Sequence, residues 1–134
     1  MSTSLSTGRR TAEFAVALRW QNATVLVHVE EDLDFYSAAD AKKLLLDVLE
    51  HQPRRIIVDV SDVFVDSSGI GVLVHIAQRV RLERGAFELT CSEPLGELMR
   101  VHGLHTLLGT NARHDPQRAD RRSAAARRQL KTAA

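Results

Sequence analysis

Residues 56–73 read IIVDVSDVFVDSSGIGVL, and this stretch decides how the chain is organised. Its first residues are branched and apolar, which predicts a central strand covered on both faces or nearly so. From Val72 to Arg84, apolar residues recur at helical spacing. The turn Asp66-Ser67-Ser68-Gly69 therefore places two hydroxyls and a carboxylate beside a helix N-terminus, whose unpaired N–H groups carry partial positive charge. A serine there either caps the helix or serves as a chemical handle.

Two strands and a helix are predicted ahead of this turn. Alternating apolar residues predict strands over residues 13–19 and 24–29, and we expect them to pair as a hairpin. Apolar residues at helical spacing then predict an amphipathic helix that starts at Ser37 and stops before Pro53. Asp40 lies three residues after Ser37, which is typical of a capping box.

The residues after the turn continue this alternation. They predict a strand over residues 86–90, a helix between Ser92 and Gly103, and a brief edge strand over residues 104–108. We expect Gly85 to end the preceding helix in a left-handed conformation. Strands that alternate with helices indicate an α/β fold with a mixed sheet.

Composition is that of an ordinary globular domain. The chain has 134 residues, of which 44% are hydrophobic and 26% charged. No apolar run approaches the ~20 residues of a membrane helix, so we expect no membrane insertion. The N-terminus lacks the apolar core of a secretory signal. The one cysteine, Cys91, cannot form an internal disulfide, and a reducing cytoplasm is the simplest location.

Charge and composition divide the chain into three parts. We expect a disordered N-terminal segment over residues 1–11, a domain over 12–110 and a basic C-terminal tail over 111–134. The tail holds seven basic and two acidic residues, a net charge of +5, and its helix-forming residues from Asp115 onward predict a frayed helix. Such a tail could contact nucleic acid or an acidic partner. Because it has no Phe, Tyr or Trp to stack on a base, we do not expect direct nucleic-acid binding.

The serines of the turn do not form a recognisable catalytic site. A nucleophilic serine needs a base within reach, but His75 lies two helical turns beyond Ser68. Gly69-Ile70-Gly71 lacks the third glycine of a dinucleotide loop. The six histidines show no metal-ligand spacing. We therefore expect no enzyme activity, no catalytic residue, no cofactor and no metal.

An acidic segment, Glu30-Glu31-Asp32-Leu33-Asp34, follows the second predicted strand. It could simply be a polar loop whose charge favours the helix N-terminus after it. Alternatively, it faces a partner. Loops that follow parallel strands gather at one end of a sheet, so Asp34 and Ser68 would then share one surface.

Residues 56–73 closely resemble the signature of STAS domains, specifically of bacterial anti-sigma factor antagonists. Glu31-Asp32-Leu33-Asp34 is similar to the Gly-Glu-Leu-Asp segment of that family, and Val101-His102-Gly103-Leu104 is similar to its late turn. The similarity covers about residues 13–110. It implies a single STAS-like domain with a sheet of four to five strands and helices packed chiefly on one face.

The resemblance also implies a partner-switching role in transcription regulation and the stress response of a bacterium. The unphosphorylated antagonist would bind a GHKL-type serine kinase, the anti-sigma factor, and so release the sigma factor. That kinase would phosphorylate Ser68, with Ser67 as the second choice, and a PP2C-type phosphatase would reverse this. The alternative is a STAS scaffold or regulatory subunit that docks constitutively, in a stress-signalling assembly or on a transporter ATPase.

The resemblance implies that Asp34 lies near the kinase contact, and we expect the residues around Ser68 and in the acidic segment to contact a partner as well. These expected partner-binding residues are Glu31, Asp34, Asp66, Ser67, Gly69 and Ile70. Glu31 stands where the family usually has glycine. If that position needs a positive φ, the local backbone must differ here. The extra negative charge beside the contact loop could also change which kinase binds.

Overall fold

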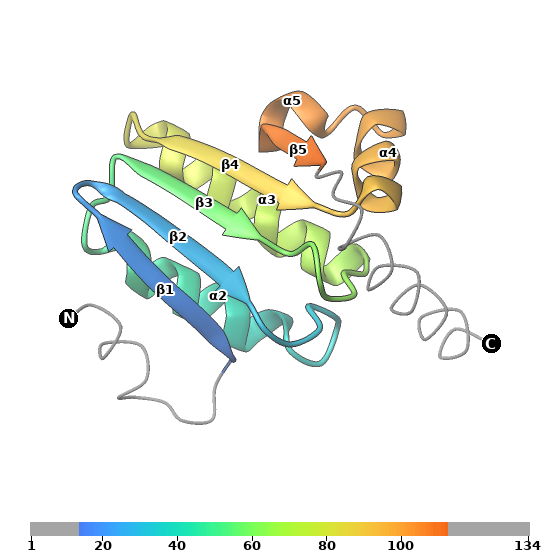
Figure 1. Ribbon diagram of the computed structural model, residues 1–134, viewed down its shortest axis with the longest axis horizontal. Coiled ribbons are helices and arrows are strands. Elements are labelled where there is room, and N and C mark those ends of the chain that lie inside the picture. Colours follow the sequence, from blue (N-terminus) through green and yellow to red (C-terminus); the bar gives the residue numbers. More distant parts are fainter. Residues whose placement is uncertain (1–13, 113–134) are drawn as a thin grey trace.

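The computed structural model describes residues 14–112, and five strands within them form one sheet (Figure 1). In sheet order the strands are β1 (Val16–Gln21), β2 (Thr24–Val29), β3 (Arg55–Asp59), β4 (Ala86–Cys91) and β5 (Thr110–Ala112). β1 and β2 are antiparallel, and each later pair of neighbours is parallel, so the predicted mixed sheet is confirmed. The sheet reaches two residues beyond 110. Residues 1–13 and 113–134 lie outside the described part, and with them the expected N-terminal segment and nearly all of the expected basic tail.

The predicted hairpin of β1 and β2 is present. Its turn contains Asn22 at φ 57°, a left-handed conformation that asparagine tolerates better than most residues. The register pairs Leu18 with Val27 and Trp20 with Val25. Val25 and Val27 are buried, so alternation along the two strands directs this row of side chains to the core.

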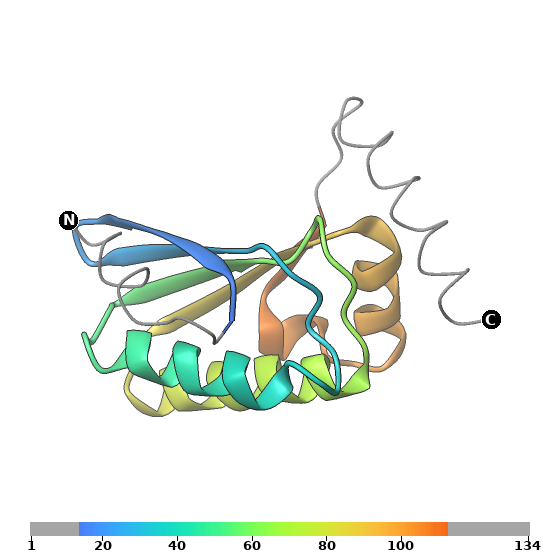
Figure 2. The ribbon, with the colours of Figure 1, turned by 90° about the horizontal axis from the view of Figure 1, so that it is seen from below.

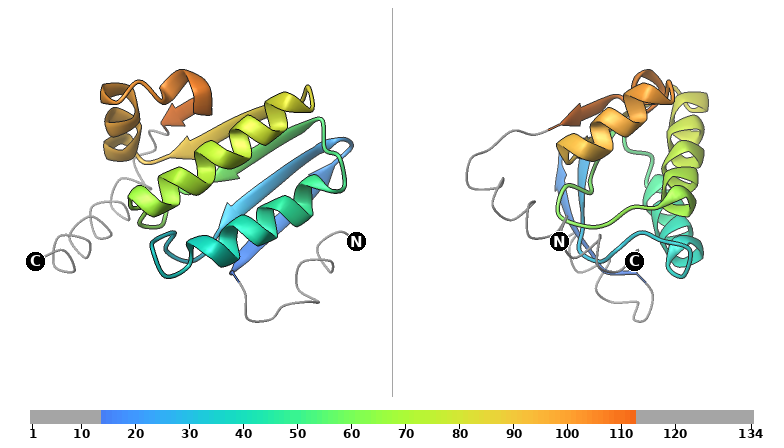
Figure 3. Two further views of the ribbon diagram at one scale, coloured as in Figure 1. Left: turned by 180° about the vertical axis from the view of Figure 1, so that it is seen from behind. Right: turned by 90° about the vertical axis from the view of Figure 1, so that its right-hand side faces the viewer.

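Two long helices, α2 (Ala38–Leu49) and α3 (Ser67–Leu82), lie against the same face of the sheet (Figures 2 and 3). Their buried residues are Ala41, Leu45, Val48 and Leu49 in α2, and Gly69, Val72, Leu73, Ile76, Ala77 and Val80 in α3. Two shorter helices, α4 (Glu93–Val101) and α5 (His105–Leu108), lie near the β5 edge. Helices chiefly on one face were expected, and this is confirmed.

β3 is the middle strand, as its apolar sequence predicts. Ile56 and Val58 are fully buried on the helix side. Ile57 points to the opposite face and is only half-buried, so the expected cover on both faces is wrong there. The apolar residue is tolerated because its register neighbour on β2, Leu26, is also apolar and half-buried, and the two shield each other.

The start of α2 differs from the prediction. Ser37 precedes the helix, but its side chain makes no capping hydrogen bond. Its hydroxyl instead donates to the carbonyl oxygen of Asp32 at 2.7 Å and accepts from the N–H of Asp34 at 3.0 Å. The predicted capping box is therefore wrong, because contacts within the preceding loop engage the hydroxyl.

The predicted edge strand over residues 104–108 is also wrong. Residues His105–Leu108 form α5, Gly109 ends it at φ 56°, and β5 starts at Thr110. Leu108 is buried, and the guanidinium of Arg81 on α3 donates to the carbonyl oxygen of Leu107. These tertiary contacts favour a helical turn in a segment too short for its own pattern to decide.

The end of α3 shows a further difference. Arg84, at φ 64°, takes the left-handed conformation that was expected of Gly85. Gly85 instead meets a need for space, because a Cβ there would lie 2.9 Å from Cγ1 of Val80. Glycine is therefore needed at position 85 because a side chain would be too close to Val80, and not because the backbone there is left-handed.

Candidate functional site

The site begins at the N-terminus of α3, which starts at Ser67 and so five residues earlier than its apolar spacing predicted. Asp66 is the N-cap, and its Oδ1 accepts from the N–H of Gly69 at 3.0 Å. Ser67 and Ser68 are therefore the first two residues of the helix. The cap is an aspartate rather than Ser68, so the serine hydroxyls are not used for capping.

Both hydroxyls of this helix start are available for chemistry. Ser67 is exposed and Ser68 is half-buried. Within residues 14–112, neither hydroxyl makes a hydrogen bond. The helix N-terminus beside them favours a negative charge.

The loop that follows β2 is fastened to this helix start. Oδ2 of Asp66 accepts from the N–H of Phe35 at 3.0 Å, while Oδ1 caps the helix. Leu33 forms a parallel bridge with Val65, and its N–H donates to the carbonyl oxygen of Phe64 at 2.8 Å. The two loops run side by side (Figure 2). The prediction that they share one surface is confirmed, and we call residues 31–37 together with 64–70 the loop surface.

Asp34 shapes the turn of the first loop. Its Oδ1 accepts from the N–H groups of Tyr36 at 3.0 Å and Ser37 at 3.1 Å. This is an Asx-turn, in which a side chain takes the place of a backbone acceptor. Asp34 and Asp66 thus hold Phe35 and Tyr36 in place, a function that the sequence analysis did not assign to them.

Three other expected contact residues occupy different environments. Gly69 is buried, and a Cβ there would lie 2.3 Å from the carbonyl oxygen of Leu33, so its lack of a side chain lets the two loops approach. Ile70 is half-buried and packs against the core. Oε2 of Glu31 accepts from the N–H of Ala15 at 2.7 Å. Glu31 does not have a positive φ, so the backbone accommodates this side chain without left-handed strain.

An exposed aromatic pair at the tip of the loop surface was missed by sequence reasoning. Phe35 is 72% exposed and Tyr36 is 89% exposed. Their ring centroids lie 5.4 Å apart in an edge-to-face arrangement. The signal was present in the sequence, because two adjacent aromatic residues in an acidic loop have no alternating or helical pattern that would bury them.

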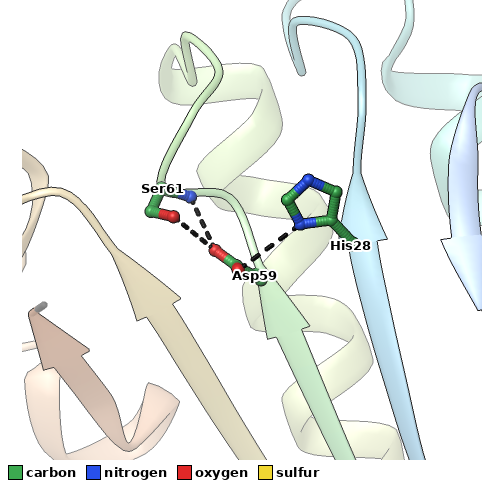
Figure 4. Close-up of polar contacts among 3 residues, drawn as sticks. All are labelled: His28, Asp59 and Ser61. Atoms are coloured by element: carbon green, nitrogen blue, oxygen red, sulfur yellow. Dashed lines mark hydrogen bonds and ion pairs between the residues drawn. The ribbon is translucent and has the colours of Figure 1, made fainter. Parts of the chain in front are cut away.

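A second polar cluster lies at the carboxyl ends of β2 and β3 (Figure 4). The carboxylate of Asp59, which is buried, accepts from the N–H of Ser61 at 3.0 Å and from its hydroxyl at 2.6 Å. The other oxygen lies 3.4 Å from Nδ1 of His28. The aspartate separates the serine from the histidine, whereas a catalytic triad needs the histidine in the middle.

Other candidate chemistry finds little support in the described residues. Cys91 is buried, and its burial, followed by the charge of Asp59, raises the pKa of its thiol to about 11, which leaves it protonated and unreactive at neutral pH. Among residues 14–112, no group of three or more His, Cys, Asp or Glu is placed to hold a metal ion. None of the helices in that range is long and apolar enough to span a membrane.

Comparisons with solved structures show the same fold. The chain is similar to TM1081 of Thermotoga maritima (20% identity over 78% of this chain and 92% of that one, TM-score 0.67). It is also similar to an anti-sigma factor antagonist of Mycobacterium paratuberculosis (17%, 85% and 95%, TM-score 0.66). A third relative is the Bacillus cell fate determinant SpoIIAA, in its phosphorylated form (18%, 80% and 98%, TM-score 0.59) and its unphosphorylated form (19%, 80% and 95%, TM-score 0.61).

Comparison with families gives the assignment. No curated protein matches the sequence. The sequence model of the STAS domain, in contrast, matches residues 15–115, a range that includes every strand and helix described above. The chain therefore belongs to the STAS domain family.

Proposed function

We propose that the chain is an anti-sigma factor antagonist whose binding is switched by phosphorylation of Ser68. The unphosphorylated form binds a serine-kinase anti-sigma factor and so releases a sigma factor. The observation that carries this proposal is the start of α3, where the hydroxyls of Ser67 and Ser68 make no hydrogen bond within the described residues and lie beside an acidic loop that Asp66 holds in place. SpoIIAA, which has the same fold, exists in phosphorylated and unphosphorylated forms.

The charge of the loop surface gives the switch a physical basis. Residues 31–37 contain three acidic and no basic residues, and residues 64–70 contain one acidic and no basic residue. A phosphoserine adds about −1.5 to −2 charges at neutral pH. It would make an already acidic contact harder to desolvate, and a loss of roughly 100-fold in affinity is enough to change partners.

The fold itself is expected to tolerate the phosphate. Ser68 is the second residue of α3, where the helix dipole favours negative charge. The N–H groups of Ser67 and Ser68 donate to no group within residues 14–112 and can donate to phosphate oxygens. Phosphorylation would therefore alter binding and leave the domain folded.

Partners and location follow from the family role. We propose a GHKL-type serine kinase as the binding partner and a PP2C-type phosphatase that restores the serine, both in the cytoplasm of a bacterium. The chain would act in transcription regulation, in a stress response. Members of this family are generally not enzymes, and we propose the same for this chain.

Ser67 and Ser68 can be told apart by direct phosphorylation. Each purified serine-kinase anti-sigma factor from the source genome is incubated with ATP and wild type, Ser67→Ala or Ser68→Ala, and the modified residue is located by mass spectrometry. We expect one kinase to modify wild type and Ser67→Ala, and to leave Ser68→Ala unmodified. Modification of Ser67 alone would show that Ser67, and not Ser68, is the phosphorylated residue.

Binding by phosphomimetic variants completes the test. We expect wild type and Ser68→Ala to bind that kinase and Ser68→Asp to lose binding. If all three variants bind one non-kinase partner equally well, the chain is a constitutive scaffold or regulatory subunit and the switch is wrong.

A further inference from the structure

We propose that Phe35 and Tyr36 are the anchor by which the chain docks on its partner, and that the partner offers an apolar pocket with a basic rim. The inference rests on the proposed function, because it takes the partner to be the serine kinase that modifies Ser68. It adds the specific residues and the chemistry of the surface that receives them.

Exposure of the aromatic pair is the first argument. Phe35 and Tyr36 are 72% and 89% exposed, and they are adjacent and in ring contact. Most other large apolar residues in the described part are buried in the core. Adjacent exposed aromatics mark interaction sites, because aromatic side chains dominate the binding energy of protein interfaces.

The pair is also held ready for binding. The N–H of Phe35 donates to Asp66 and the N–H of Tyr36 donates to Asp34. Ser37, the next residue, makes contacts with Asp32 and Asp34 that close the turn. A loop that is already ordered loses little conformational freedom on docking, so more of the contact energy appears as affinity.

The charge around the pair indicates what kind of partner fits. Acidic residues precede and follow it (Glu30, Glu31, Asp32, Asp34 and Asp40), and Asp66 lies in contact with it. A partner surface with lysine or arginine at its rim and an apolar centre would complement this arrangement. These acidic residues oppose docking on an anionic membrane, so we take the occupant to be a protein surface.

The position of the pair explains how phosphorylation of Ser68 could affect docking through Phe35 and Tyr36. The two oxygens of Asp66 contact the N–H of Phe35 and the N–H of Gly69, so one side chain joins the anchor to the helix start that carries Ser68. A partner that covers the aromatic pair would thus also meet Ser68. Phe35 and Tyr36 would contribute affinity whether or not Ser68 is phosphorylated. The phosphate on Ser68 would determine whether the rest of the interface can form.

The test measures affinity for the kinase that phosphorylates Ser68. Calorimetry compares wild type, Phe35→Ala, Tyr36→Ala and the double variant. The control is Leu82→Ala, because Leu82 is 80% exposed but lies at the far end of α3. We expect the double variant to bind about 100-fold more weakly and the control to stay within about twofold. All variants should unfold at the wild-type urea concentration, because the removed side chains are exposed.

The outcomes separate the anchor from the switch. If the double variant binds the kinase as wild type does, while Ser68 is still phosphorylated, the anchor is wrong and the proposed function stands. If no kinase binds or phosphorylates wild type, the proposed function is wrong and the anchor is overturned with it. Flotation with vesicles of anionic lipid is the third arm. Vesicle binding by wild type that the double variant lacks would show a membrane as the occupant instead of a protein.

Discussion

Two aspartates, Asp59 at the carboxyl end of β3 and Asp66 at the N-cap of α3, each hold a loop in place but differ in what they support. Asp59 is buried and fastens its own turn through Ser61, with His28 beside it (Figure 4). Asp66 is half-buried and holds a different loop by accepting from the N–H of Phe35. Both use two carboxylate oxygens, but one stabilises the inside of the fold and the other arranges a surface.

This difference teaches that a carboxylate beside a candidate switch need not be a partner contact. The sequence alone predicts that Asp66 and Asp34 bind a partner. In the structure both accept backbone N–H groups of their own chain, and the residues that they hold outward are Phe35 and Tyr36. If the comparison is right, variants near Asp59 reduce stability, and variants near Asp66 reduce binding.

The largest stability effect is expected at Gly69, where the loop surface meets the core. A Cβ in Gly69→Ala would lie 2.3 Å from a backbone oxygen of Leu33, so we expect a loss of about 3 kcal/mol in the free energy of unfolding, measured in urea. Gly71→Ala is the matched control. It has no atom within 4 Å of the new Cβ and lies in the same helix, so it should gain about 0.5–1 kcal/mol. A gain in Gly69→Ala equal to that in Gly71→Ala would show that helix propensity, and not close approach, decides.

The next effect is expected at Asp59. Asp59→Ala leaves the buried N–H and hydroxyl of Ser61 without this acceptor, which should cost about 2 kcal/mol of unfolding free energy. Kinase affinity should be unchanged at a temperature where the variant remains folded. Weaker binding at unchanged stability would show that the buried cluster belongs to the binding site.

Asp66 is expected to give the complementary result. Asp66→Ala removes the cap and should lose about 1 kcal/mol of stability, with weaker kinase binding because Phe35 is released. Asp66→Asn can still cap the helix through its amide oxygen, but it has no second acceptor for the N–H of Phe35. We expect near-normal stability with reduced affinity for this variant. Wild-type affinity in Asp66→Asn would show that the contact to Phe35 has no part in binding.

The smallest effect concerns Cys91 and alkaline pH. Its pKa of about 11 in the folded chain lies above the value near 9 that it has when unfolded. The stability from the protonated thiol is therefore complete below pH 9 and is lost as pH rises toward 11. By pH 10, wild type should lose up to about 1 kcal/mol more than Cys91→Ala. Parallel pH profiles of the two proteins would contradict a buried, protonated thiol.

The parts of the fold that the sequence predicted are those with a repeated apolar pattern. The strand over residues 24–29 was found with the predicted limits, because every second residue from Val25 faces the core. The motif around Ser68 indicated the family, and the position of the acidic loop predicted its closeness to that serine. Both depend on spacing along the chain, which is visible without coordinates.

The parts that were missed depend on contacts between distant segments. The hydroxyl of Ser37 donates to the carbonyl oxygen of Asp32 in the loop and does not cap α2. Residues 105–108 are helical, and Arg81 on α3 contacts them. The partnership of Asp66 with Phe35 spans 31 residues and has no local signature. For these residues a local rule competes with a tertiary contact, and the tertiary contact decides.

The most direct measurement is the affinity of one kinase for two forms of the same chain. Wild type is phosphorylated to completion at Ser68, and its dissociation constant is compared by calorimetry with that of the unmodified chain. Circular dichroism confirms that both forms are folded. The account predicts binding about 100-fold weaker after phosphorylation, at unchanged fold. Equal dissociation constants for the two forms would contradict it.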